Sequence, residues 1–395
     1  MRIDLSSDTT VLIKLETKNT LQTVEINAQK QDRIENRVQM SQVTVPIEQI
    51  KRMPMVLGEA DVFKTLQFLP GVKSGSEGTA GILVRGGSQD QNLVLLDGVP
   101  IYNPTHIGGL FSVFNADALR NVALTKGGFP ARFGGRLSSV VEVETKDGHK
   151  KEFHAEAGIG LLLSKLTIEG PILRDKLSFM VSGRRTYLDL LLNQLINETN
   201  PTGTGKVTLK RKINFYDVNA KLNYIINDRH NLFFSIYQGF DIFQTDELTE
   251  EPKFESLNSN GFNFKNQTAT LKWHWKVSNR LFSNTVLYRT LYDFNYLDNT
   301  KTKFENIIGD TTLFKFNSNV KDIAIKSDWD YLIDSKQRLK FGVNLISHEF
   351  IPSRNLFQSN LFDFDNNKTD TVIGGEINKG LEADIYVEDN FKFKK

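Results

Sequence analysis

The chain has 395 residues, more than one soluble hydrophobic core usually holds, so two or more structural units are expected. Its 49 Lys and Arg against 47 Asp and Glu provide no long-range field that would attract nucleic acid or acidic lipid. There is no Cys, which excludes disulfides and thiolate metal sites.

The sequence contains no run of 18 apolar residues, which excludes an ordinary transmembrane helix. A membrane role would therefore need a β-barrel. The first residues, Met1 to Leu5, lack the basic start, apolar stretch and cleavage site of a secretory signal. Either the protein stays in the cytoplasm or the sequence begins downstream of its true start.

Elements predicted before Gly148 are short and of mixed type. Residues 11–16 form a strand candidate, and residues 29–42 are polar without a period, as in a linker. A helix is expected over 60–69, because Val62, Phe63, Leu66 and Leu69 share one face. Further strands are expected at 81–85, 92–96, 122–125 and 140–145, with a brief helix capped by Asn115. This unit is small, α/β and rich in Gly turns.

After Gly148 long alternating strands replace the helical period. In residues 381–388 every odd position is apolar, and three of the four even positions are charged. Residues 216–226 are apolar at even positions, with Asp217, Asn219, Lys221 and Asn223 between them. The segments 271–277 and 323–331 repeat the pattern. Such strands predict a sheet with one face in lipid and the other in water.

The connections between these strands alternate in length. Short polar turns are expected at 173–176, 227–230, 277–280 and 334–338, and long excursions at 187–211, 241–261, 299–310 and 352–380. Short periplasmic turns and long external loops are typical of outer-membrane barrels. Aromatic residues near the short turns, as in an interfacial girdle, are Trp273, Trp275, Trp329 and Tyr331. The alternative is a large soluble β-sandwich.

Five segments of the α/β unit carry a resemblance to a known family. They are residues 66–72, 84–87, 96–102, 122–135 and the strand that ends at Thr145-Lys146. In order and spacing they resemble the plug domain of TonB-dependent receptors. The matching motif positions are Arg85, Gly86, Gly87, Asp97, Gly98, Pro100, Gly127, Gly128, Arg132, Gly134, Gly135 and Arg136.

The resemblance implies four regions and a fold class. Residues 1–20 resemble a remnant of a carboxypeptidase-regulatory-like β-sandwich, 21–42 a TonB-box candidate with its linker, 43–148 the plug, and 149–395 the first part of a transmembrane β-barrel. The box candidate, which could equally be a plain interdomain strand, comprises Thr23, Val24, Glu25, Ile26, Asn27 and Ala28. As an extended segment it would add to a sheet edge of TonB.

The implied activity is plug-gated import in the outer membrane of a Gram-negative bacterium, energised through TonB and its inner-membrane complex. Outer-membrane lipid and possibly a surface lipoprotein would be further partners, with no nucleic acid. Barrels of this kind have about 22 strands, and about ten are expected here. We therefore expect an incomplete chain that aggregates or is degraded when expressed alone.

Two site expectations follow from the same resemblance. Arg85, Arg132 and Arg136 could pair with carboxylates of the barrel wall, or could be solvated turn residues. The turn lengths also predict sidedness, with a tight external turn at 160–164 and periplasmic turns from 173–176 onward. A Cys at Asn258 would then be labelled from outside the cell, and one at Ser278 only from the periplasm.

Other functions and motifs remain weaker. A signalling receptor of the same architecture and a soluble or surface-anchored β-rich binding protein are the alternatives. No Ser-His-Asp order stands on a nucleophile elbow, so neither an enzyme nor a cofactor is expected. Residues 202–207 do not form a phosphate loop, because Val207 stands at the Ser/Thr position. A calcium site with Asp363, Asp365 and Asn367 as ligands stays open. His149 and His154 are interpreted as incidental rather than as metal ligands. The ligand itself, siderophore, oligosaccharide or peptide, is not specified.

Overall fold

The computed structural model describes residues 41–53, 58–76, 79–195, 199–202, 205–305, 307–361 and 368–392. The expected β-sandwich remnant at 1–20, the TonB-box candidate at 23–28 and the calcium-loop residues at 363–367 lie outside this part of the chain. Among the residues described, no helix is long and apolar enough to cross a membrane.

The first part of the described chain is a small α/β unit, which we call the plug. Its elements are β1 (Gln42–Pro46), α1 (Ile47–Arg52), α2 (Val62–Leu66), β2 (Val72–Ser74), β3 (Ile82–Val84), η2 (Gln89–Gln91), β4 (Asn92–Leu96), β5 (Val99–Pro100), β6 (Thr105–His106), η3 (Ile107–Gly109), β7 (Phe111–Ser112), η4 (Ala116–Ala118), β8 (Leu119–Thr125) and β9 (Ser139–Thr145). Five strands pair in the order β1-β8-β9-β4-β5, so β1 and β5 are the edges.

Local signals place most plug elements where the sequence predicted them. Asn115 caps η4 by accepting a hydrogen bond from the Asp117 amide, 3.1 Å away, as expected. Helix α2 is shorter than the expected 60–69 and begins after Asp61, whose side chain accepts from the Lys64 amide. The core beneath these elements includes the fully buried Ile50, Val62, Leu66, Val122 and Leu124.

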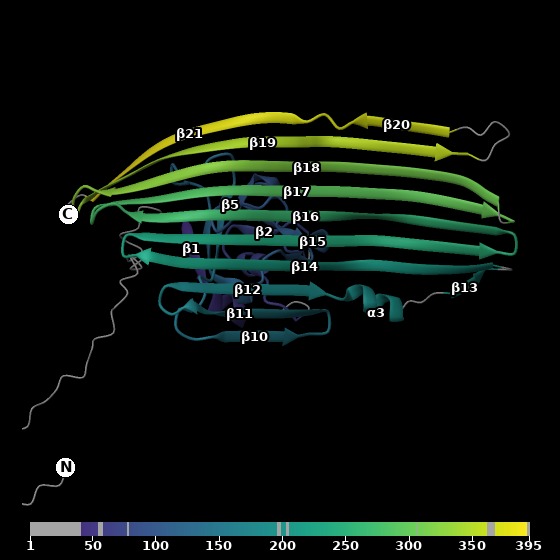
Figure 1. Cartoon of the computed structure of the whole chain (residues 1–395), viewed down its shortest axis with the longest axis horizontal. Coiled ribbons are helices and arrows are strands. Elements are labelled where there is room, and N and C mark those ends of the chain that lie inside the picture. Colours follow the sequence, from purple (N-terminus) through teal and green to yellow (C-terminus); the bar gives the residue numbers. More distant parts are fainter. Residues whose placement is uncertain are drawn as a thin grey trace, which may run out of the picture. The chain divides into compact units, whose positions relative to one another are not determined.

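The rest of the chain forms one large antiparallel sheet. Its strands are β10 (His154–Ile159), β11 (Leu163–Leu173), β12 (Leu177–Thr186), β13 (Thr199–Thr202), β14 (Gly205–Asn227), β15 (His230–Glu251), β16 (Phe254–Lys276), β17 (Leu281–Phe304), β18 (Ile307–Leu332), β19 (Gln337–Asn360), β20 (Lys368–Gly374) and β21 (Asn378–Phe391), with α3 (Leu188–Leu195) after β12. In Figure 1, β14 to β19 run side by side as long strands.

The four expected short turns are present at one end of these strands, between β11 and β12, β14 and β15, β16 and β17, and β18 and β19. The expected long loops at 241–261 and 299–310 were wrong. Strand β15 continues to Glu251 and β16 begins at Phe254, while β17 continues to Phe304 and β18 begins at Ile307. These residues therefore extend the sheet.

One face of the sheet carries an apolar band. A single row of register partners crosses five strands, and each of its side chains is between 42% and 48% exposed: Phe234, Leu271, Leu287, Ile325 and Leu345. Adjacent large apolar side chains that remain exposed in a row are what a lipid-facing barrel wall requires. Nearer the short turns, Trp273, Trp275 and Trp329 follow one another at 5.3 and 6.2 Å between ring centroids, which matches the expected girdle.

The two faces exchange character further along the strands. Beyond the band, Asn263, Asn295 and Asn317 occupy the outer face and hydrogen bond to one another at 3.1 and 2.8 Å. The neighbouring residues Phe262 and Phe294 therefore point to the inner face, because successive residues of a strand alternate. Because of this reversal, the strand halves beyond the apolar band do not continue the pattern of an apolar outer face. For this reason their sequence resembled that of loops.

Candidate functional site

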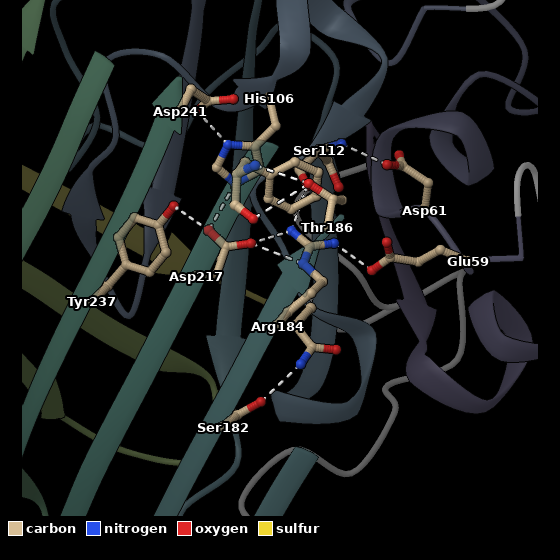
Figure 2. Close-up of polar contacts among 12 residues, drawn as sticks. Glu59, Asp61, His106, Ser112, Ser182, Arg184, Thr186, Asp217, Tyr237 and Asp241 are labelled. Atoms are coloured by element: carbon tan, nitrogen blue, oxygen red, sulfur yellow. Dashed lines mark hydrogen bonds and ion pairs between the residues drawn. The ribbon is translucent and has the colours of Figure 1, made fainter. Parts of the chain in front are cut away.

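The inner face of the sheet holds the plug through a buried polar cluster, which we call the latch. Plug residues contribute Glu59, Asp61, His106 and Ser112, and the sheet contributes Arg184 from β12, Asp217 from β14, and Tyr237 and Asp241 from β15 (Figure 2). The latch joins residues more than a hundred positions apart, such as His106 and Asp217.

Arg184 is the centre of the latch. Its Nε donates to Asp217 Oδ2 at 2.8 Å, Nη2 donates to the Ser112 carbonyl oxygen at 2.9 Å, and Nη1 donates to Glu59. The side chains of Arg184, Glu59 and Asp217 are each 1% exposed. A guanidinium suits this position because its planar fork can bind several acceptors at once. Loss of such a buried cation would leave the Glu59 carboxylate without a partner for its charge.

His106 forms the second bridge of the latch. Its Nε2 lies 2.7 Å from Asp217 Oδ1 and its Nδ1 lies 2.6 Å from Asp241 Oδ2. Burial alone would lower the pKa of His106, but the two carboxylates outweigh it and raise the pKa to about 9. At neutral pH the ring is therefore an imidazolium that donates from both nitrogens. Asp241 also accepts from the Ile107 amide at 2.9 Å, which fixes the same plug loop.

Glu59 and Asp61 connect the latch to the start of α2. Asp61 caps α2 with Oδ1 and accepts from the Ser112 amide with Oδ2 at 2.6 Å. Burial raises the pKa of Glu59 despite the Arg184 guanidinium beside it. Its Oε2 has no hydrogen-bond partner among the described residues. The Glu59 carboxylate, like the Ser112 hydroxyl, is thus an incompletely satisfied part of the latch.

A second plug-to-sheet contact uses a residue of the family motif. Asp97 accepts from the Thr145 hydroxyl at 2.5 Å and from the Lys221 ammonium at 3.2 Å, and Lys221 lies on β14. Burial would raise the pKa of Asp97, but Lys221 and Lys272 hold it below its usual range. The motif pair is also a tight turn, with φ of 52° at Asp97 and 89° at Gly98.

A third contact lies near the first strands of the sheet. Asp117 is 2.7 Å from both Lys51 of α1 and Lys165 of β11, and Lys51 also reaches Glu156 of β10 at 2.8 Å. The ammonium groups outweigh the effect of burial and hold the pKa of Asp117 below its usual range. Together the three contacts attach the plug to five neighbouring strands, β10, β11, β12, β14 and β15.

Pairing of the motif arginines with carboxylates of the sheet, one of the two possibilities that the sequence left open, is not seen among the described residues. Arg132 pairs with Glu142 of the plug at 3.1 Å, and Arg136 donates to the carbonyl of its neighbour Gly135. In the described part of the chain, neither Arg85 nor Arg136 forms an ion pair with the sheet. The plug segment still touches the sheet through its backbone, because the Ala131 amide donates to Glu388 of β21 at 3.2 Å.

Several motif glycines supply backbone conformations that other residues rarely adopt. Positive φ values occur at Gly86, Gly127, Gly128 and Gly135. Arg85 shares this conformation at φ 49° without being Gly. These residues shape turns of the plug and are not part of the latch.

Sequence reasoning missed the latch residues Glu59, His106, Arg184 and Asp241. A signal existed only for Asp217, which belongs to the polar face of 216–226 that was expected to meet water. That face instead lies buried against the plug, since Asp217, Asn219, Lys221 and Asn223 are at most 6% exposed. Buried polar residues on a strand call for partners, and here the partners come from the plug.

Beyond the latch, the inner face of the sheet carries an aromatic array. Phe243 stacks on Phe262 with centroids 5.0 Å apart, and Phe264, Phe294 and Phe316 continue the array at 5.2 to 5.8 Å. The array begins beside the latch, because Phe264 is the register partner of Asp241. We call these five rings the aromatic wall.

Comparison with known proteins places the plug in a family. The model of the TonB-dependent receptor plug domain matches residues 35–141. The vitamin B12 transporter BtuB of Vibrio vulnificus (strain YJ016) is 29% identical over 146 residues, which are 36% of this chain and 23% of that protein. The structure of the outer membrane transporter YddB from Escherichia coli is similar with a TM-score of 0.55 at 12% identity, over 89% of this chain and 55% of that one.

The chain thus spans about a quarter of the curated relative and about half of the solved one. Residues 35–141 match the plug-domain model, and the chain shares its fold with the outer membrane transporter.

Proposed function

Because this chain has the plug domain and the strand architecture of a TonB-dependent receptor, we propose that it imports a nutrient across the outer membrane of a Gram-negative bacterium. The plug closes the lumen, and energy delivered through TonB and its inner-membrane complex opens it. Both relatives compared above are named as transporters, which supports transport rather than catalysis.

The observation that carries this proposal is the latch. A ligand can pass only if the plug leaves the inner face of the sheet, and Arg184 and His106 hold it there through charged hydrogen bonds out of water. The latch itself is polar, although apolar side chains also pack across the interface, as Phe111 does with Leu163 and Phe215. A permanent domain interface is normally apolar in its core. Polar contacts can be replaced by water once the plug moves, so the latch is suited to reversible opening.

The order of elements along the chain supports opening from the N-terminal side. Strand β1 is an edge of the plug sheet and pairs only with β8, over residues 42–46. The next latch residue along the chain is Glu59, whose contact with Arg184 is incompletely satisfied. A pull applied through the TonB-box candidate at 23–28 would therefore remove β1 first and then withdraw Glu59, with His106 released last.

The aromatic wall bears on the class of ligand. Its five rings lie on the inner face and carry no charge, and flat rings favour ligands that present aromatic or other apolar ring faces. Phe264 of the aromatic wall is the register partner of Asp241, which binds His106. A ligand on the wall would therefore lie next to the plug loop that contains His106. A ligand would then bind next to the residues whose contacts must break when the latch opens.

Two alternatives make different predictions. A signalling receptor of this architecture would change gene expression without depleting its ligand from the medium. A soluble β-rich binding protein would leave the exposed apolar row of the sheet without a partner, a costly exposure in water. The row supports a membrane location, with outer-membrane lipid as its partner. A surface lipoprotein partner remains a prediction.

Uptake can be tested without knowing the ligand. Cells that lack the gene and cells that carry the complete receptor are grown in the same complex medium, and the compounds that disappear are compared by mass spectrometry. We expect at least one compound to be depleted only by cells that have both the receptor and TonB. Equal depletion by both strains, or depletion independent of TonB, would overturn the proposal.

A further inference from the structure

The segment that joins the plug to the large sheet brings together three potential metal ligands. His149, Glu152 and His154 each offer one ligand atom, and these atoms lie within 4.8 Å of one another. The segment runs from the end of β9 at Thr145 to the start of β10 at His154. The latch and the aromatic wall use none of these three residues.

The imidazoles are close enough for one ion. The rings of His149 and His154 meet edge to face with centroids 4.5 Å apart, and His154 Nε2 is 3.9 Å from Glu152 Oε2. Ligand atoms of tetrahedral Zn²⁺ lie about 3.3 Å apart for bonds of about 2.0 Å. The ligand atoms lie up to 4.8 Å apart, so they must approach by up to about 1.5 Å. The side chains of Glu152 and His154 are 72% and 51% exposed and are free to make this movement.

The His149 ring is oriented by the backbone in either tautomer. Its Nδ1 lies 2.8 Å from the Glu152 amide nitrogen and 3.1 Å from the Glu152 carbonyl oxygen. With the ring proton on Nε2, Nδ1 accepts from the Glu152 amide. Binding a metal through Nε2 requires the proton to move to Nδ1, which then gives up the amide bond and donates to the Glu152 carbonyl instead. A backbone carbonyl that accepts from the second nitrogen is the usual support of a metal-binding His.

The surrounding segment is fixed at both ends, which keeps the ligands together without the metal. The Asp147 carbonyl accepts from the Ser178 hydroxyl at 2.8 Å, and the Lys150 carbonyl accepts from the Asp175 amide at 3.0 Å. Phe153 packs so closely on Gly170 that a Cβ there would lie 2.3 Å from its ring. The segment therefore loses less conformational entropy when an ion binds.

We propose that His149, Glu152 and His154 bind a Zn²⁺ ion, with water in the remaining position, and that the ion stiffens the tether between plug and sheet. Two imidazoles and one carboxylate are a common ligand set for Zn²⁺, whereas Mg²⁺ and Ca²⁺ prefer oxygen alone. Lys150 and Lys151 lie between the ligands and oppose the positive ion, so binding should be reversible rather than permanent. The tether keeps the plug attached while the latch opens.

Trypsin provides a direct readout, because Lys150 and Lys151 lie inside the loop that the ion would close. The purified receptor in detergent is treated with trypsin with and without Zn²⁺, and cleavage after these two lysines is followed by mass spectrometry. We expect Zn²⁺ to slow this cleavage at least several-fold, and Co²⁺ to give the visible absorption of a site with nitrogen and oxygen ligands. Both effects should disappear in His149→Gln and His154→Gln.

His230→Gln is the matched control, since this His is the first residue of β15, at the same end of the sheet, and is not a member of the cluster. It should keep full protection and the Co²⁺ spectrum. Glu152→Gln should weaken Zn²⁺ binding about tenfold without changing the fold, because the side chain is exposed. Protection that survives both His substitutions, or no protection in the unaltered protein, would overturn the metal site and leave the import proposal untouched.

Discussion

The ring of His106 stacks on the ring of Phe215, with centroids 4.1 Å apart and planes 8° from parallel. The guanidinium of Arg184 lies 5.0 Å from the same ring. Phe215 of β14 therefore contacts both cations of the latch. Its π face attracts both cations and keeps water away from their hydrogen bonds.

The first prediction concerns pH. Because the pKa of His106 is raised to about 9, its contribution to plug docking is complete below about pH 6.5 and is lost as the pH rises through about 9. The loss should be on the order of 3 kcal/mol for an imidazole held between two carboxylates. Hydrogen exchange of the plug loop around His106, corrected for intrinsic rates, should show faster opening at pH 10 than at pH 7. In His106→Gln, opening should already be fast at pH 7 and its pH dependence should vanish.

A second prediction concerns the centre of the latch. Arg184→Met leaves Glu59 buried without its cation and removes one of the two cations that bind Asp217, which should destabilise plug docking by about 3–5 kcal/mol. The plug should open spontaneously, and cells should become sensitive to antibiotics too large for ordinary porins. Arg120→Met is the control, because Arg120 is half exposed and pairs only within the plug, so its loss should cost about 1 kcal/mol or less. Equal sensitivity of the two variants would contradict the assignment.

The third prediction tests the TonB-box candidate. Val24→Pro and Ile26→Pro each remove a backbone donor and fix φ, so strand addition to TonB should fail and uptake should stop while ligand binding is retained. Val24→Ala keeps the backbone donor and should retain most uptake. If both Pro variants transport normally, residues 23–28 are a passive linker.

A fourth prediction tests sidedness by cysteine labelling, for which the absence of Cys from the sequence gives a clean background. Asn258, chosen from the sequence as a loop residue, lies within β16, so the better external site is Lys253 in the turn between β15 and β16. Lys253→Cys should react with an impermeant maleimide on intact cells. Ser278→Cys, in the short turn before β17, should react only after the outer membrane is opened. The reverse order would invert the topology.

The fifth prediction concerns the aromatic wall. Phe262→Ala and Phe294→Ala should each weaken binding of the depleted compound about fivefold, because each removes one ring contact of about 1 kcal/mol. Asn263→Ala and Asn295→Ala change the next residue on each strand but on the opposite face, and should leave affinity unchanged. Equal effects on both faces would mean that the strands are merely destabilised.

Sequence patterns predicted the elements that depend on near neighbours. The Asn115 cap, the strand at 92–96 and the four short turns arise from local chemistry and were found as expected. The latch could not be predicted in this way. His106 contacts carboxylates that are 111 and 135 residues away in the sequence, and no local pattern indicates these partners. The halves of the strands beyond the apolar band were interpreted as loops. In them the polar side chains lie on the outer face, whereas in the apolar band the outer face is apolar.

The reversal of the two faces has a consequence for how such a receptor diversifies. Beyond the apolar band, one residue of each pair, such as Phe262, lies on the inner face, which the proposed ligand would pass, while its neighbour, Asn263, lies on the outer face. Paired strands keep the backbone constant whichever of the two residues changes. Selection for a new nutrient and selection to escape phages or antibodies can therefore act on alternate positions of one strand without interfering with each other.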